Sequence, residues 1–77
     1  MLTTRQINDM NHEVSHGATI VGYITQAWVH PKGRPTLGVG LWGFTASKEG
    51  EAAGYADTEW RFNSWKQALS AIAQAAA

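Results

Sequence analysis

The sequence predicts an α+β fold in which one helix, three strands and a second helix follow one another in a single domain, residues 1–77. Two observations carry this prediction. Apolar residues recur at helical spacing near both ends, and the middle of the chain is rich in β-branched and aromatic residues that alternate with small or polar ones. Because the connections are short, the strands should form a three-stranded antiparallel meander with both helices on one face.

Size and composition restrict the class of protein. The 77 residues include no cysteine, so neither a disulfide framework nor a thiolate metal site can stabilise the chain. A chain of this length buries only about 60% of the surface that its unfolded form exposes, so the core must be small. Six basic residues balance six acidic ones, so no long-range field attracts nucleic acid or an anionic membrane. The sequence contains neither a signal-peptide core nor a run of about 18 apolar residues, so we expect a soluble, unprocessed, cytoplasmic protein without a membrane partner.

The first helix is predicted over residues 4–16. Thr3 and Gln6 fit the capping box, in which two side chains three residues apart satisfy free N–H groups at a helix start. The apolar residues that follow at helical spacing are Ile7, Met10 and Val14. Gly17 stands where helices commonly end in the left-handed conformation.

Two strands joined by a tight loop are predicted next. Residues 18–30 are rich in β-branched and aromatic side chains, and the loop PKGRP, residues 31–35, supplies two prolines and a glycine. The second strand, residues 36–46, has an aliphatic side and a nearly bare side: Leu37, Val39 and Leu41 against Gly38, Gly40 and Trp42. We expect the aliphatic side to face the core.

The facing of the strand within residues 18–30 is ambiguous. Ile20, Ile24 and Trp28 form a good core set, yet Gln26 falls in the same register. Either a β-bulge or the opposite facing would remove this conflict.

The rest of the chain predicts a loop, a strand and a helix. Residues 47–54, SKEGEAAG, are charged, small and glycine-rich, which is typical of a solvated, mobile loop. A third strand is predicted over residues 55–62, with Ala56, Thr58, Trp60 and Phe62 facing in and Tyr55, Asp57, Glu59 and Arg61 facing out. Asn63 or Ser64 can cap the last helix. Its apolar residues at helical spacing are Trp65, Leu69, Ile72 and Ala76.

The pentapeptide HEVSH, residues 12–16, matches the H-E-x-x-H signature of zinc peptidases. In the predicted helix, His12, Glu13 and His16 lie opposite the apolar stripe, so the motif should point into water. A catalytic zinc needs a third protein ligand and a walled cavity, but the remaining histidine, His30, is predicted at a hairpin end. We therefore interpret the motif as helix surface and expect no metal and no cofactor. A zinc hydrolase is a remote alternative, and adventitious metal capture by the histidine pair stays open.

Candidate partner-binding residues fall into two groups. The loop tip carries a basic patch of His30, Lys32 and Arg34, which would contact a carboxylate or phosphate of a partner. The open face of the sheet should combine the two aromatic residues of the first strands with the outward residues of the third, that is Tyr23, Trp42, Tyr55, Asp57, Glu59 and Arg61. Aromatic residues and arginine are enriched in protein interfaces. A solvated turn and an ordinary solvated sheet face are the alternatives.

The order of helix, three strands and helix, together with the alanine-rich end NSWKQALSAIAQAAA, is similar to the double-stranded RNA-binding domain. The resemblance implies contacts between the last helix and RNA phosphates, which that family makes with a cluster of lysines. Here Lys66 stands alone at the start of the helix, and the net charge is zero. Because the resemblance lacks this lysine cluster, nucleic-acid binding is the alternative rather than the leading hypothesis.

The leading hypothesis is a non-enzymatic protein-binding module that acts by occupying a larger protein or nucleoprotein complex. Catalysis requires convergent groups with tuned pKa values in a cavity, and so short a chain offers few of them. In size, aromatic content and lack of cysteine the chain is similar in character to small phage-encoded proteins, including anti-CRISPR inhibitors. A homodimer through Tyr23 and Trp42 is a further option, because it would add to a small core.

Overall fold

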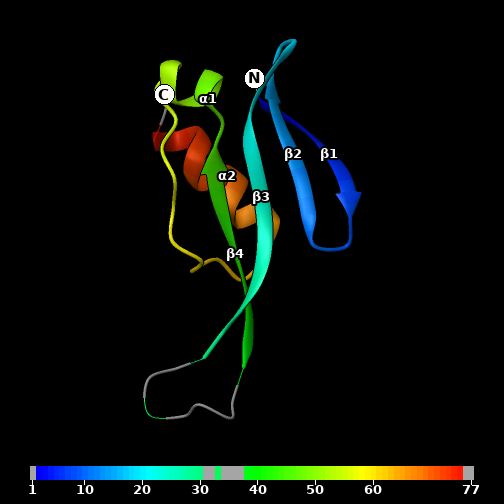
Figure 1. Cartoon of the computed structure of the whole chain (residues 1–77), viewed down its shortest axis with the longest axis vertical. Helices are drawn as coiled ribbons and strands as arrows, with labels where there is room; N and C mark the ends of the chain where they lie inside the picture. Colours follow the sequence, from blue (N-terminus) through cyan, green and yellow to red (C-terminus); the bar gives the residue numbers. More distant parts are fainter. Residues whose placement is uncertain (1, 31–32, 34–37, 76–77) are drawn as a thin grey trace.

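The structure is a computed structural model that describes residues 2–30, 33 and 38–75, and it confirms the α+β class (Figure 1). The order of elements differs from the prediction, because the four strands all precede the two helices. The elements are β1 (Leu2–Asn8), β2 (Asn11–His16), β3 (Thr19–Val29), β4 (Val39–Ala46), α1 (Lys48–Ala52) and α2 (Trp65–Ala75). The strands form one antiparallel meander in the order β1-β2-β3-β4.

The predicted helix over residues 4–16 is wrong, because this part of the chain forms the hairpin of β1 and β2. Its turn is closed by Asn8, whose side-chain oxygen accepts hydrogen bonds from the Met10 N–H and the Asn11 amide, each at 2.9 Å. Of the expected helical stripe only Val14 is buried, whereas Ile7 and Met10 are 51% and 40% exposed. Pairing of β2 with β3 therefore overrides a helical spacing that depended on three residues.

A β-bulge in β3 settles which of its residues face the core. Val14 pairs with Gly22 and Ser15 pairs with Ile20, so Val21 is an extra residue opposite β2. The bulge turns Val21 and Ile24 into the core and leaves Ile20 38% exposed. The bulge thus removes Ile20 from the predicted core set, but Gln26 stays on the same face as Ile24, so the bulge does not remove the conflict over Gln26.

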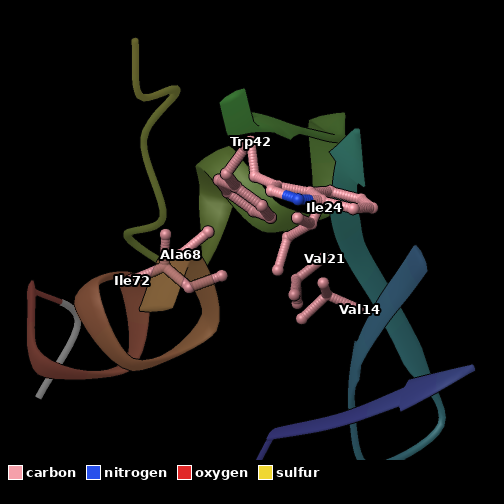
Figure 2. Packing of buried hydrophobic residues seen from close by; sticks show 7 residues of the cluster. Val14, Val21, Ile24, Trp42, Ala68 and Ile72 are labelled. Atoms are coloured by element: carbon pink, nitrogen blue, oxygen red, sulfur yellow. The ribbon is translucent and has the colours of Figure 1, made fainter. Parts of the chain in front are cut away.

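The core lies between the sheet and α2 (Figure 2). Its buried residues are Val14, Val21, Ile24, Trp42 and Phe44 of the sheet and Ala68 and Ile72 of α2. The predicted facing of β4 is reversed: Trp42 is 8% exposed, whereas Val39 is 41% exposed. Trp42 lies directly opposite Gln26 and two positions from Phe44, on the face that α2 covers. The covering helix, rather than the alternation within β4, therefore decides its facing.

The final helix confirms the prediction for the C-terminal part of the chain, although Ala76 lies outside the described residues. Ser64 caps it by accepting a hydrogen bond from the Gln67 N–H at 3.2 Å, and the Gln67 side-chain oxygen accepts one from the Asn63 N–H at 3.2 Å. Trp65 and Leu69 pack partly against the core, as their spacing predicted. The cap fixes where α2 begins and therefore which part of the sheet it covers.

The segment predicted as a loop, residues 47–54, contains the short helix α1. Ser47 caps this helix by accepting a hydrogen bond from the Gly50 N–H at 3.0 Å, and its hydroxyl donates to the Ile20 carbonyl at 2.7 Å. Gly50 is buried so close to β3 that a Cβ built on it would lie 1.8 Å from the Val21 carbonyl oxygen. This close approach holds α1 against the sheet.

The predicted third strand, residues 55–62, is not a regular strand, although it runs along the free edge of β4. Trp42 and Phe62 exchange two backbone hydrogen bonds, of 2.8 and 3.1 Å. At two other positions, side-chain oxygens replace the backbone carbonyls that a neighbouring strand would supply. Asp57 accepts a hydrogen bond from the Ala46 N–H at 2.8 Å, and the Thr58 hydroxyl accepts one from the Phe44 N–H at 2.9 Å. The edge of β4 is thereby closed to other strands from Trp42 to Ala46.

We expect Gly50→Ala to destabilise the protein, even though alanine gains about 1 kcal/mol over glycine in an unobstructed helix. The added methyl group meets the Val21 carbonyl, so α1 must shift, at a cost of about 1–3 kcal/mol. Urea unfolding followed by tryptophan fluorescence measures the change in the free energy of unfolding. The control is Glu51→Ala, an exposed position in the same helix, for which we expect a change below about 0.5 kcal/mol. Equal stability of Gly50→Ala and the wild type would contradict the close packing of α1.

Candidate functional site

The HEVSH motif lies on β2 rather than on a helix, so its residues alternate between the two faces of the sheet. His12 is 5% exposed and faces the core, which makes the expectation that the motif points into water wrong for this residue. Glu13 lies on the opposite face, where its carboxylate binds the Arg5 guanidinium at 3.1 Å. His16 is exposed. Within the described residues no group of three or more histidine, aspartate or glutamate side chains is placed to hold a metal ion.

His12 belongs to an aromatic cluster with two tryptophans. Its ring stacks on Trp65 of α2 with the centroids 4.3 Å apart and the planes 20° apart. The Trp42 ring meets it edge to face, with a centroid distance of 5.5 Å. Burial in this cluster lowers the pKa of His12 from its ordinary value of 6.5, because the imidazolium would lose its hydration. The chemistry of His12 is therefore that of a neutral core residue that joins β2 to α2.

The most exposed large apolar side chain among the described residues is Trp28, which is 68% exposed. It lies on the arm, a name we give to residues 27–30 and 38–41. The arm is the part of the β3–β4 ladder that runs past the helices, away from α1 (Figure 1). Sequence reasoning missed this residue, because Trp28 was assigned to the core set of its strand. The signal that could have found it is the pair of glycines opposite, since they give the indole no side chain to pack against.

The arm presents Trp28 as a flat surface supported from behind. Trp28 pairs with Gly40, and a Cβ built on Gly38 would lie 3.2 Å from Cε3 of the indole. The indole therefore rests on bare backbone. His30 is exposed beside it and also approaches Gly38, within 3.4 Å of the same built Cβ position. Lys32 and Arg34, the other two residues of the predicted basic patch, lie outside the described residues.

The two aromatic residues expected together on an open sheet face are separated. Trp42 is buried under α2, whereas Tyr23 is 38% exposed on the opposite face, in line with Glu13 and Thr45 on the neighbouring strands. The combined Tyr23 and Trp42 surface that was predicted for a homodimer is therefore not formed. Tyr23 instead lines a shallow polar depression with Ile20 and Glu49.

Three of the four outward residues predicted for the third strand come together around one pocket of about 230 Å³. Tyr55, Asp57 and Arg61 line it from one side, and α2 lines it from the other. Glu59 is exposed and does not line the pocket. The segment does not alternate as expected, because it bulges away from β4. Thr58 bonds to Phe44 and Phe62 bonds to Trp42, so residues 59–61 lie opposite Gly43 alone. The bulge places Trp60 against Gly43, where a built Cβ would lie 2.7 Å from the indole.

Comparison of the chain with protein-family models, with curated proteins and with solved structures finds no match. The topological resemblance to the double-stranded RNA-binding domain loses its basis, because the described chain begins with a hairpin where that resemblance required a helix. Among the described residues, neither α1 nor α2 has the length and apolar character needed to cross a membrane.

We expect the stability of the fold to depend on pH through His12. The unfolded chain takes up a proton near pH 6.5, whereas the folded chain takes it up only at lower pH, because burial lowers the pKa of His12. The free energy of unfolding should therefore be highest above pH 6.5 and fall as the pH decreases from 6.5 through the lowered pKa. Urea unfolding at several pH values between 7.5 and 5.5 measures this slope.

Two variants test whether His12 causes the pH dependence of the free energy of unfolding. His12→Phe keeps an aromatic ring between the tryptophans and should reduce the pH dependence. His16→Gln removes an exposed imidazole and should leave it in place. The assignment to His12 fails if both variants keep the slope of the wild type.

Proposed function

We propose that this chain is a non-enzymatic protein-binding module that engages a larger protein or nucleoprotein complex through the arm. The observation that carries the proposal is the exposure of Trp28, 68%, on a part of the hairpin that extends beyond the helices. Tryptophan is among the residues most enriched at the energetic centres of protein interfaces. An indole that its own chain supports from behind loses little side-chain freedom on binding, so more of the contact energy remains for affinity.

The shape and apolar character of the arm favour insertion into a groove of the partner. Trp28 is exposed on one face of the arm, and Val39, 41% exposed, lies on the other. The molecule measures 41 Å along its long axis and 23 and 19 Å across, which is consistent with a projecting hairpin. A flat partner surface would cover only one of the two apolar faces. A groove would cover both, as fully desolvated anchors require.

The charge of the sequence between the two strands of the arm suggests an acidic groove. The sequence from Trp28 to Val39 contains His30, Lys32 and Arg34 and no acidic residue. The whole chain has no net charge, so this local positive charge would orient the arm at short range rather than attract a partner from a distance. The roles of Lys32 and Arg34 in this proposal rest on the sequence alone.

The finer form of the proposal is inhibition by occupancy. A small chain that fills a groove of a much larger complex would block that groove in a ratio of one to one. Phage-encoded inhibitors such as anti-CRISPR proteins likewise block a larger nucleoprotein complex. The other six partner-binding candidates remain part of the proposal in separate places. Tyr23 would contribute from the open face, and Tyr55, Asp57, Glu59 and Arg61 would contribute from the segment beside β4. Trp42 would act indirectly, because it supports the core.

We expect Trp28→Ala to weaken partner binding by about 30-fold, which corresponds to about 2 kcal/mol for an interface centre. The fold should be retained, because the indole is mostly exposed. The measurement is affinity capture from candidate host lysates with the tagged chain, followed by calorimetry with the purified captured protein. Met10→Ala is the matched control, because Met10 is an exposed apolar residue on the β1–β2 turn.

A partner that binds the wild type and Trp28→Ala equally would overturn the role of the arm. Binding of single-stranded nucleic acid that depends on Trp28 and weakens steeply with salt would replace the protein partner with a nucleic acid, because bases also stack on exposed indoles.

A further inference from the structure

The pocket beside α2 has an apolar floor and a rim that is held in place by hydrogen bonds. Ile72, which is 3% exposed, forms part of the floor, and Ala71 and Ala75 of the same helix leave space above it. The rim is anchored at Tyr55, whose N–H donates to the Gly50 carbonyl at 2.9 Å, and at Thr58, whose N–H donates to the Phe44 carbonyl at 2.9 Å. A ligand would therefore meet a wall that is already ordered.

The two charged residues of the pocket, Asp57 and Arg61, differ in the contacts that they make within the chain. Asp57 accepts the Ala46 N–H at 2.8 Å, so its carboxylate is engaged in closing the β4 edge. Arg61 lies over the Phe62 ring, with its guanidinium carbon 5.0 Å from the ring centroid. Within the described residues the one ion pair joins Arg5 and Glu13, so Arg61 has no carboxylate partner there. Asp57 keeps its negative charge, but its hydrogen bond to the Ala46 N–H holds its carboxylate at the β4 edge. The Arg61 cation is therefore the group of the pocket that a ligand carboxylate can bind.

We propose that this pocket binds the C-terminal residue of a partner polypeptide, with the apolar side chain of that residue on the Ile72 floor and its carboxylate on Arg61. A volume of about 230 Å³ is smaller than the common range for drug-sized ligands, about 300–1,000 Å³, and suits one large apolar residue. A terminal residue carries its side chain and its carboxylate on the same Cα. One small pocket with one cation beside it can therefore bind both groups.

This site is separate from the arm, because neither Trp28 nor His30 lines the pocket. The inference rests on the partner contacts proposed above for Tyr55, Asp57 and Arg61, gives them a specific ligand, and can be tested without the partner. If capture experiments contradict the role of the arm, the proposal for the pocket is not affected. If small probes do not bind the pocket, the proposal for the arm is not affected.

The experiment titrates the full chain with N-acetyl-L-phenylalanine and follows the backbone amide resonances by NMR. We expect saturable shifts in residues 54–61 and 71–75 with a Kd of about 1 mM, in keeping with so small a ligand. N-acetyl-L-phenylalaninamide, which has no carboxylate, should bind about two- to fivefold more weakly, because the ion pair is partly solvated. Free phenylalanine carries an ammonium group and should bind no more tightly than the acetylated probe.

Variants test each half of the pocket. Arg61→Gln should bind the acid and the amide equally well, at the affinity of the amide. Ala71→Leu should fill the space above Ile72 and reduce binding of both probes at least tenfold, and Ala75→Leu gives a second filling variant in case the first fails to fold. Ala73→Leu is the matched control, because Ala73 is an exposed residue of α2 that does not line the pocket.

Three outcomes would overturn the proposal. One is the absence of shifts at 54–61 with the acid, and another is an unchanged preference for the acid in Arg61→Gln. The third is clearly tighter binding of free phenylalanine, which would assign the pocket to a free amino acid rather than to a polypeptide end.

Discussion

The limited length of α2 is the constraint on which the rest of the structure depends. Its 11 residues extend about 16 Å, whereas the 11 residues of β3 extend about 36 Å. A helix of this size can cover less than half of the longest strand, so the core forms only where the two overlap. The sheet residues beyond the end of α2 are not covered by this helix. Trp28 is therefore exposed although it lies on the same face of the sheet as the buried Ile24.

The aromatic cluster around His12 shows how a small core holds distant parts of the chain together. His12 belongs to the first hairpin, Trp42 to the last strand and Trp65 to the last helix, and the three rings lie in contact. Together with Val14, His12 joins the N-terminal hairpin to the rest of the fold. A histidine at this position offers a flat ring that stacks well, but burial penalises its charged form. Cohesion of the core and sensitivity to pH therefore have the same cause.

The sequence was informative where a local signal agreed with the final packing. The cap at Ser64 and the stripe that includes Ile72 gave α2, and the β-branched residues before and after PKGRP gave β3 and β4. The helix predicted in place of the first hairpin was wrong, because its helical spacing depended on only three apolar residues. Strand pairing with β3 outweighed this weak signal. Gly17 does adopt the left-handed conformation, with φ of 63°, but it does so in the β2–β3 turn rather than at a helix end.

The candidate sites were harder to predict than the fold, because exposure is not a local property. Trp28 and Trp42 were each assigned to the wrong environment, since the position of α2 decides which one it covers. Tyr55, Asp57 and Arg61 line one pocket, although the alternating strand from which they were predicted does not form. The bulge that breaks the alternation also brings these three side chains to one pocket. Both the arm and the pocket lie where regular packing ends, because a core of seven buried apolar side chains leaves its margins uncovered.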